Sequence, residues 1–410
     1  MSPPTATATL TAAEQVDKIV NKYNASAPTI QIDLTNAEKI NVNDNDIDLL
    51  PETTKARLTK YGIDLSKGYP FRPSELPLFL DDAYKIRNVP NTTWVDRGTN
   101  ADPEKKALFA KVKEVKHLTK HIGTELVGLD LGSLNKKELD ELALLISERV
   151  VVAIKDIDLS PQKHLELGYF WGADVEKHPL QAQALPGITV VWHKYNRGGG
   201  LISFQKGTRA QLNHQDLSHE LNSASITHLH LDSIPDVGGD TQFYSGYAAY
   251  DKLSKPFQQF LDGKNAVYKS AHRYYDRDDL LGGPKNINRE HPLIITHPVT
   301  GWKSLNYNPA HTVRIVGLEP EESELILNYL NDIYTKNLDI QVRIPWQPTK
   351  KGLGTSVIWD NRISQHVAIA DYNDQWEGPV RHAHRVTSLT KPVTFDPESK
   401  SQREALGLAV

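Results

Sequence analysis

Two histidine–aspartate pairs in this 410-residue chain have the spacing of metal ligands. One pair is His214 and Asp216, and the other is His230 and Asp232. The distant His366 could complete either pair as a set of two imidazoles and one carboxylate. Such a set leaves three positions open on one face of an iron ion, as non-haem Fe(II) oxygenases require. Because the chain has 16 histidines, about one such pair is expected by chance, and spacing alone leaves both pairs open.

The composition excludes several other chemistries. The chain has no cysteine, so disulfides, iron–sulfur clusters, thiolate zinc sites and cysteine nucleophiles are ruled out, and a metal must be held by His, Asp or Glu. The net charge of -4 gives no broad attraction to nucleic acid or to an anionic membrane. No run reaches the roughly 18 apolar residues of a membrane span, and the N-terminus lacks the pattern of a secretory signal. We therefore expect a cytoplasmic protein with no nucleic-acid or membrane partner.

The apolar pattern indicates which elements must position the site. Pro, Asn and Asp interrupt residues 1–103, which we interpret as a partly irregular extension in front of a main domain at 104–410. Within the main domain many short strands separated by turns predict a mainly β fold, a sandwich or jelly roll flanked by helices. Asn135 is a candidate N-cap for the first of these helices. Helices are predicted over 134–149, 160–172, 248–263 and 319–334, and a pair of strands is predicted around a turn at Thr300 and Gly301.

The motifs around the first pair decide between the two. The chain has Gly-Gly-Asp-Thr at 238–241, Trp-Asp-Asn-Arg followed by Gln-His at 359–366, and two arginines four apart at 381 and 385. In this combination it resembles the taurine/sulfonate dioxygenase (TauD/TfdA) family of Fe(II)- and 2-oxoglutarate-dependent enzymes. There the metal histidine precedes Gly-Gly-Asp-Thr by about two dozen residues. His214 precedes it by 24 positions and His230 by only 8, so the resemblance selects the first pair and leaves the second as structural.

The resemblance covers about residues 115–395 and implies a double-stranded β-helix (jelly roll). It implies an iron site of His214, Asp216 and His366, with 2-oxoglutarate and O2 as cosubstrates. By resemblance Arg381 binds the distal carboxylate of 2-oxoglutarate, and the hydroxyl of Thr241 adds a hydrogen bond. A guanidinium suits this role because it can make two parallel hydrogen bonds to a carboxylate. Arg385 is the rival for the same role.

The substrate side departs from the family pattern. His178 stands before a proline as the family's sulfonate-binding histidine does, and Arg385 would join it as an anion anchor. Gln181 and Asn213 stand where relatives have tyrosine and tryptophan, and Leu217 follows the carboxylate ligand, so these three are further candidate contacts. The resemblance implies a small organic anion, preferably a sulfonate. Its hydroxylation would give an aldehyde and sulfite, with release of succinate and CO2.

Two alternatives stay open. The same chemistry could act on a phenoxy or carboxylic acid, or on a purine such as xanthine, because Gln181 and Gln183 could hydrogen-bond a heterocycle. A non-catalytic jelly-roll binding protein is the alternative from another class. The complete ligand set and both arginines favour an enzyme. The resemblance also suggests a homo-oligomer.

Overall fold

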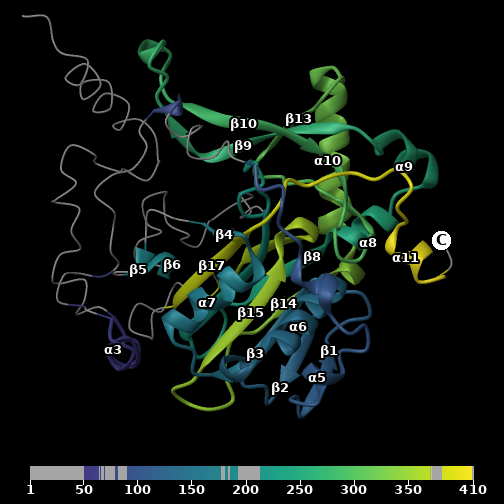
Figure 1. Ribbon diagram of the computed structural model, residues 1–410. Coiled ribbons are helices and arrows are strands. Elements are labelled where there is room, and N and C mark those ends of the chain that lie inside the picture. Colours follow the sequence, from purple (N-terminus) through teal and green to yellow (C-terminus); the bar gives the residue numbers. More distant parts are fainter. Residues whose placement is uncertain are drawn as a thin grey trace, which may run out of the picture.

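The computed structural model describes residues 50–63, 65, 69, 79–81, 90–176, 181–182, 185–192, 213–369, 371 and 381–408 (Figure 1). Within this part of the chain the largest sheet has nine strands. They are β1 (Glu114–His117), β2 (Thr124–Val127), β3 (Val151–Ile157), β4 (Asp174–Val175), β5 (Gln181–Ala182), β6 (Leu185–Trp192), β7 (Ala224–Ser233), β15 (Gly354–Asp360) and β17 (His382–Leu389). Their order is β1-β2-β3-β15-β7-β17-β6-β5, and β4 pairs with β17.

Smaller sheets surround this main sheet. A three-stranded sheet has the order β14-β8-β16, a second has the order β10-β9-β13, and β11 pairs with β12. The β11–β12 hairpin confirms the strand pair predicted around the turn at Thr300 and Gly301. The strands are β8 (Thr241–Ser245), β9 (Asn265–Tyr274), β10 (Lys285–Pro292), β11 (Ile294–Thr296), β12 (Lys303–Leu305), β13 (Thr312–Ile315), β14 (Gln341–Ile344) and β16 (Ser364–Ala368).

The predicted helices form with one exception. The side chain of Asn135 caps the first of them in a capping box with Glu138, as predicted. The prediction of one helix over 248–263 is wrong, because the chain breaks there into α8 and α9. Pro256 lies in the first turn of α9, where its missing N–H costs no helical hydrogen bond. The helices are α3 (Glu52–Lys60), α5 (Lys106–Phe109), α6 (Lys136–Arg149), α7 (Pro161–Trp171), α8 (Gly246–Asp251), α9 (Lys255–Leu261), α10 (Pro320–Lys336) and α11 (Gln402–Ala405).

Strand β3 shows how the layers pack. Val152 and Ile154 point outward and join the apolar cluster under helices α6 and α7. Val151 and Ala153 point inward and pack with side chains of the β14-β8-β16 sheet, such as Phe243. The strand is therefore apolar on both faces, which explains its uninterrupted apolar sequence.

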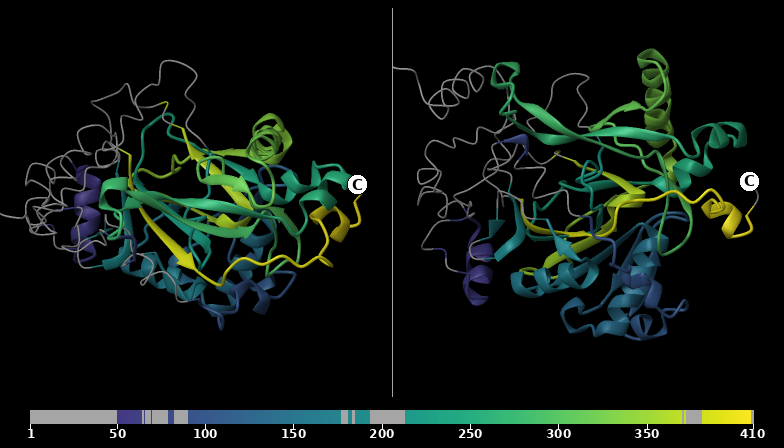
Figure 2. Two further views of the ribbon diagram at one scale, coloured as in Figure 1. Left: turned by 90° about the horizontal axis from the view of Figure 1, so that it is seen from above. Right: turned by 45° about the horizontal axis from the view of Figure 1, so that its top comes forward.

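Two facing sheets with helices outside them form the double-stranded β-helix that was predicted. Helices α6 and α7 lie on one side of the main sheet, and the β10-β9-β13 sheet with α10 lies on the opposite side (Figures 1 and 2). Helix α3 lies beside the region of β5, β6 and α7 (Figure 1). None of the helices that the structure describes combines the length and the apolar character needed to cross a membrane.

Candidate metal centre

The backbones of His214 and His366 hold the two imidazoles side by side. The N–H of His214 donates to the carbonyl of His366 at 3.0 Å, and the N–H of His366 donates to the carbonyl of His214 at 2.8 Å. This isolated antiparallel bridge adds the segment around His214 to β16, the edge strand of the small sheet. Side chains directly opposite each other in such a pair project to the same face. The two ring centroids are 4.4 Å apart.

Asp216 completes the group. Its Oδ1 lies 3.6 Å from Nε2 of His214, and its Oδ2 lies 4.0 Å from Nε2 of His366. One ligand atom from each of the three residues lies within 4.8 Å of the others. Two imidazoles and one carboxylate that converge in this way fit an Fe(II) ion with an open face. The structure thus brings together the three residues that the sequence predicted as ligands.

Asn361 positions the loop that carries Asp216. Its Oδ1 accepts hydrogen bonds from the N–H of Asp216 at 3.3 Å and from the indole of Trp359 at 3.0 Å. Its carbonyl accepts from the side chain of Gln215 at 3.0 Å, and its own amide donates to the hydroxyl of Thr227. The sequence showed Asn361 only as part of a motif and did not reveal this positioning contact.

The surroundings keep the ligands in their metal-binding forms. Burial, together with the charge of His214, lowers the pKa of His366 to about 3, so its imidazole is neutral near pH 7. Burial alone would raise the pKa of Asp216, but Arg385 and the two histidines outweigh it and hold that pKa well below its usual value. A neutral imidazole and an ionised carboxylate are the forms that bind a metal.

Arg385 lies within this centre. Its Nη1 is 3.1 Å from Oδ2 of Asp216, and its Nη2 is 2.8 Å from Oε2 of Glu176. Burial raises the pKa of Glu176, although the charge of Arg385 opposes that shift. Glu176 was missed in the sequence, where its only signal is a position two residues before His178.

Thr241 and Arg381 meet at a tryptophan that no motif marks. The hydroxyl of Thr241 accepts a hydrogen bond from Nε1 of Trp346 at 3.0 Å. The guanidinium of Arg381 lies 5.7 Å from the ring centroid of the same tryptophan. Both Thr241 and Arg381 are buried. The structure therefore gathers the two residues that the sequence predicted for 2-oxoglutarate.

The Gly-Gly-Asp-Thr motif has a clear structural reason. Gly238 has a φ of 78°, and a Cβ atom there would lie 2.6 Å from Oδ1 of Asp371. The N–H of Gly239 donates to the same oxygen at 2.8 Å. Arg343 links this aspartate to the motif, because its Nη2 donates to Oδ2 of Asp371 at 2.9 Å and its Nε donates to Oδ2 of Asp240 at 2.5 Å. Only glycine permits this close approach with a positive φ, and the turn leads directly into Thr241.

The remaining predicted substrate contacts have mixed outcomes. The amide of Asn213 is buried and donates to the side chain of Gln365, so it links the residues that directly precede His214 and His366. Leu217, which adopts a left-handed conformation with φ 53°, lines a cavity of about 20 Å³ beside Asp216. His178 and the side chain of Gln181 lie outside the described residues.

The second histidine–aspartate pair has other partners. Nδ1 of His230 lies 3.0 Å from the hydroxyl of Ser356. Asp232 accepts a hydrogen bond from Nδ1 of His382 at 2.6 Å and another from the guanidinium of Arg57. These contacts account for both residues within the packing of the main sheet.

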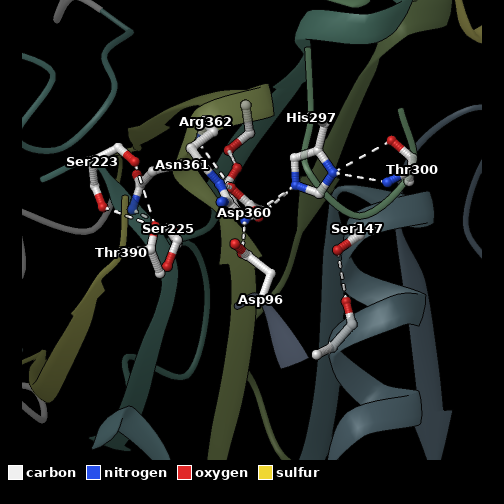
Figure 3. Close-up of polar contacts among 12 residues, drawn as sticks. Asp96, Ser147, Ser223, Ser225, His297, Thr300, Asp360, Asn361, Arg362 and Thr390 are labelled. Carbon is white, nitrogen blue, oxygen red and sulfur yellow. Dashed lines mark hydrogen bonds and ion pairs between the residues drawn. The ribbon is translucent and has the colours of Figure 1, made fainter. Parts of the chain in front are cut away.

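The Trp-Asp-Asn-Arg motif also anchors a residue of the predicted extension. Nη2 of Arg362 lies 2.6 Å from Asp360 and 2.7 Å from Asp96, and His297 lies 3.0 Å from Asp360 (Figure 3). His297 and Asp360 are fully buried. Asp96, from the predicted extension, thus joins a buried charge network beside β16.

Comparisons with known proteins find one family and several similar proteins. Residues 114–387 match the family described as "Taurine catabolism dioxygenase TauD, TfdA family". An alpha-ketoglutarate-dependent sulfonate dioxygenase of Saccharomyces cerevisiae is 34% identical over 330 residues, which cover 77% of each chain. An alkylsulfatase of Acinetobacter baylyi is 30% identical over 64% of this chain and 81% of its own. The crystal structure of a taurine dioxygenase from Burkholderia xenovorans is 27% identical, with a TM-score of 0.58 over 71% of this chain and 94% of that chain.

Proposed function

Because this chain belongs to the TauD, TfdA family, and is therefore a dioxygenase that uses Fe(II), O2 and 2-oxoglutarate (alpha-ketoglutarate), we propose that it hydroxylates a small organic sulfonate. The observation that carries the proposal is the position of Arg385. Its partly buried guanidinium lies against the carboxylate of Asp216, so a cationic group for an anionic substrate stands directly at the metal centre. Hydroxylation of the carbon that carries the sulfonate leads to loss of sulfite and leaves an aldehyde.

Different residues of the site would bind the iron, bind 2-oxoglutarate and exclude water. His214, Asp216 and His366 would hold the iron, and Arg381 with Thr241 would hold the distal carboxylate of 2-oxoglutarate. When bound, iron and 2-oxoglutarate use O2 to oxidise a substrate C–H bond while succinate and CO2 are released. Aromatic rings close one side of the centre, since Trp359 and Phe243 lie with ring centroids 4.9 and 5.9 Å from that of His366.

Arg385 would bind the sulfonate together with His178. A guanidinium can donate two parallel hydrogen bonds to an oxyanion, which places the adjacent carbon as well as neutralising the charge. Glu176 holds the other side of this guanidinium and keeps it directed at the metal centre. Gln181 and Leu217 would line the rest of the pocket, and Asn213 would act through Gln365.

The two arginines are expected to affect different reactants. Arg381→Lys should raise the KM for 2-oxoglutarate by roughly 10- to 100-fold, because an ammonium cannot replace a bidentate charged hydrogen bond worth about 1.5–3 kcal/mol. Arg385→Lys should raise the KM for the sulfonate by a similar factor. Steady-state kinetics with each reactant varied in turn measures both constants. If Arg385→Lys raised the KM for 2-oxoglutarate and Arg381→Lys did not, the roles assigned to the two arginines would be exchanged.

A substrate panel tests the sulfonate directly. We expect at least one of taurine and the C2–C6 alkanesulfonates to give sulfite and succinate in equal amounts with Fe(II), 2-oxoglutarate and O2. The same panel includes an alkyl sulfate, which would release sulfate, and phenoxyacetate and xanthine. The His214→Ala protein is the blank for uncoupled chemistry. Succinate from another substrate class, with no sulfite from any sulfonate, would overturn the proposal.

A further inference from the structure

Strand β17 packs between two different apolar clusters. On one face Val386 joins a cluster with Leu58 and Tyr69, which belong to the N-terminal segment, defined here as α3, Ile63 and Tyr69. On the other face Ala383 joins the cluster between the main sheet and the β14-β8-β16 sheet, which also contains Trp359 beside His366. Alternate residues of a strand point to opposite faces, so the two clusters assign every side chain of β17 to one face or the other.

Both anion-binding arginines belong to the inner face. Arg385 shares the orientation of Ala383, and it reaches Asp216. Arg381 directly precedes the strand in the same alternation. His382 and His384 alternate with the arginines and face the N-terminal segment. The position of the arginines therefore depends on what holds the two histidines behind them.

A hydrogen-bonded chain from the N-terminal segment holds them. The hydroxyl of Tyr69 lies 2.9 Å from Nε2 of His382 and 2.7 Å from Nε2 of His384, and all three side chains are fully buried. Nδ1 of His382 lies 2.6 Å from Asp232, which also accepts a hydrogen bond from Arg57 of α3. The chain runs from His384 through Tyr69 back to β17 at His382, and from there through Asp232 to Arg57, so it includes two residues of the N-terminal segment.

The donors and acceptors in this chain can be assigned. Burial opposes ionisation of Asp232, but His382 and Arg57 outweigh it and hold its pKa well below the usual value, so Asp232 only accepts. Nδ1 of His382 therefore carries a proton, and whenever the ring carries no second proton its Nε2 accepts from the hydroxyl of Tyr69. The oxygen of Tyr69 then accepts from Nε2 of His384. One hydroxyl thus serves both histidines, and phenylalanine could serve neither.

We propose that Tyr69 is a positioning residue for Arg381 and Arg385, and that the N-terminal segment thereby sets the affinity for 2-oxoglutarate. The proposal rests on the role of Arg381 given under the proposed function. A displacement of about 1 Å in a positioning group is enough to weaken binding or catalysis strongly. Loss of the Tyr69 hydroxyl removes one hydrogen bond from each of two side chains, His382 and His384, on the strand that carries both arginines.

Tyr69→Phe tests this by removing one oxygen atom. Isothermal titration calorimetry of the full chain loaded with Mn(II) measures binding of 2-oxoglutarate without turnover. We expect the Kd for 2-oxoglutarate to rise about 5- to 10-fold, which corresponds to about 1–1.4 kcal/mol. The affinity for Mn(II) should change less than the affinity for 2-oxoglutarate, since none of the three candidate ligands lies on β17 and only Asp216 contacts a residue of that strand, Arg385.

Tyr334→Phe is the matched control. Tyr334 on α10 is also fully buried, and its hydroxyl donates to the carbonyl of Leu305 at 2.7 Å. Both variants should lose thermal stability, but only Tyr69→Phe should weaken the binding of 2-oxoglutarate. Equal Kd values for Tyr69→Phe and the wild type would overturn the positioning role. Failure of the wild type to bind 2-oxoglutarate, or unchanged binding in Arg381→Lys, would instead contradict the role given to Arg381.

Arg57→Lys gives an independent reading if Tyr69→Phe does not fold. Lysine keeps the charge beside Asp232 but cannot also reach the carbonyl of Leu159, to which Arg57 donates. We expect a two- to fourfold rise in the Kd for 2-oxoglutarate. A Kd equal to that of the wild type in this variant would likewise overturn the proposal.

Discussion

His214→Ala is expected to remove iron binding and to lower succinate formation by at least about a thousandfold, because a bound metal supplies several kcal/mol of the catalysis and each 1.36 kcal/mol is tenfold in rate. The alanine leaves Asp216 and His366 with one imidazole too few for the iron site. Metal content after anaerobic loading with Fe(II), and the visible charge-transfer absorbance on addition of 2-oxoglutarate, report binding independently of turnover.

His230→Ala is the matched control, since it removes a histidine of the same spacing motif. Its ring contacts Ser356 and lies against the backbone at Gly354, so the variant should lose thermal stability through a cavity and a lost hydrogen bond. It should still bind iron and turn over. If His230→Ala lost iron and His214→Ala kept it, the metal centre would have been assigned to the wrong pair.

The second large effect is a steep loss of stability in mild acid. Four fully buried histidines on or against the main sheet have a pKa below the usual 6.5, in each case chiefly because burial disfavours the charged ring. The unfolded chain therefore binds more protons than the folded chain once the pH drops below about 6.5. The free energy of unfolding must then fall as the pH falls, until the folded pKa values are reached; for His164 that is about 3. The four residues are His164, His228, His230 and His384.

The expected loss of unfolding free energy follows from the binding of one proton by each of the four histidines. Each histidine contributes about 1.4 kcal/mol per pH unit, so four contribute roughly 5–6 kcal/mol per unit well below pH 6.5. A stability of about 5–15 kcal/mol would be exhausted within about one to three pH units. Urea unfolding of the metal-free protein between pH 8 and pH 5 measures the slope. His228→Gln should reduce that slope by about 1.4 kcal/mol per pH unit, and a stability that is flat from pH 7 to pH 5.5 would show that these rings are not neutral in the folded chain.

Short-range features could be read from the sequence because neighbouring residues decide them. The capping box of Asn135 and the hairpin at Thr300 depend on residues within a few positions of each other. The break between α8 and α9 also has a local cause, Pro256, which the prediction of one helix over 248–263 did not take into account. The choice of His214 over His230 came from the family resemblance, in which the metal histidine precedes Gly-Gly-Asp-Thr by about two dozen residues.

The sequence by itself thus determined a mainly β fold through periodicity, and its motifs predicted, through the family resemblance, the type of metal centre and the residues to be gathered there. Only the tertiary structure decided which groups support those residues. Arg385 meets Glu176 across 209 positions, and Tyr69 meets His384 across 315. No local pattern marks such pairs, because each forms only when the sheet brings distant segments together. The paired backbones of His214 and His366 show the same rule, since two separate stretches of chain become one site through two hydrogen bonds.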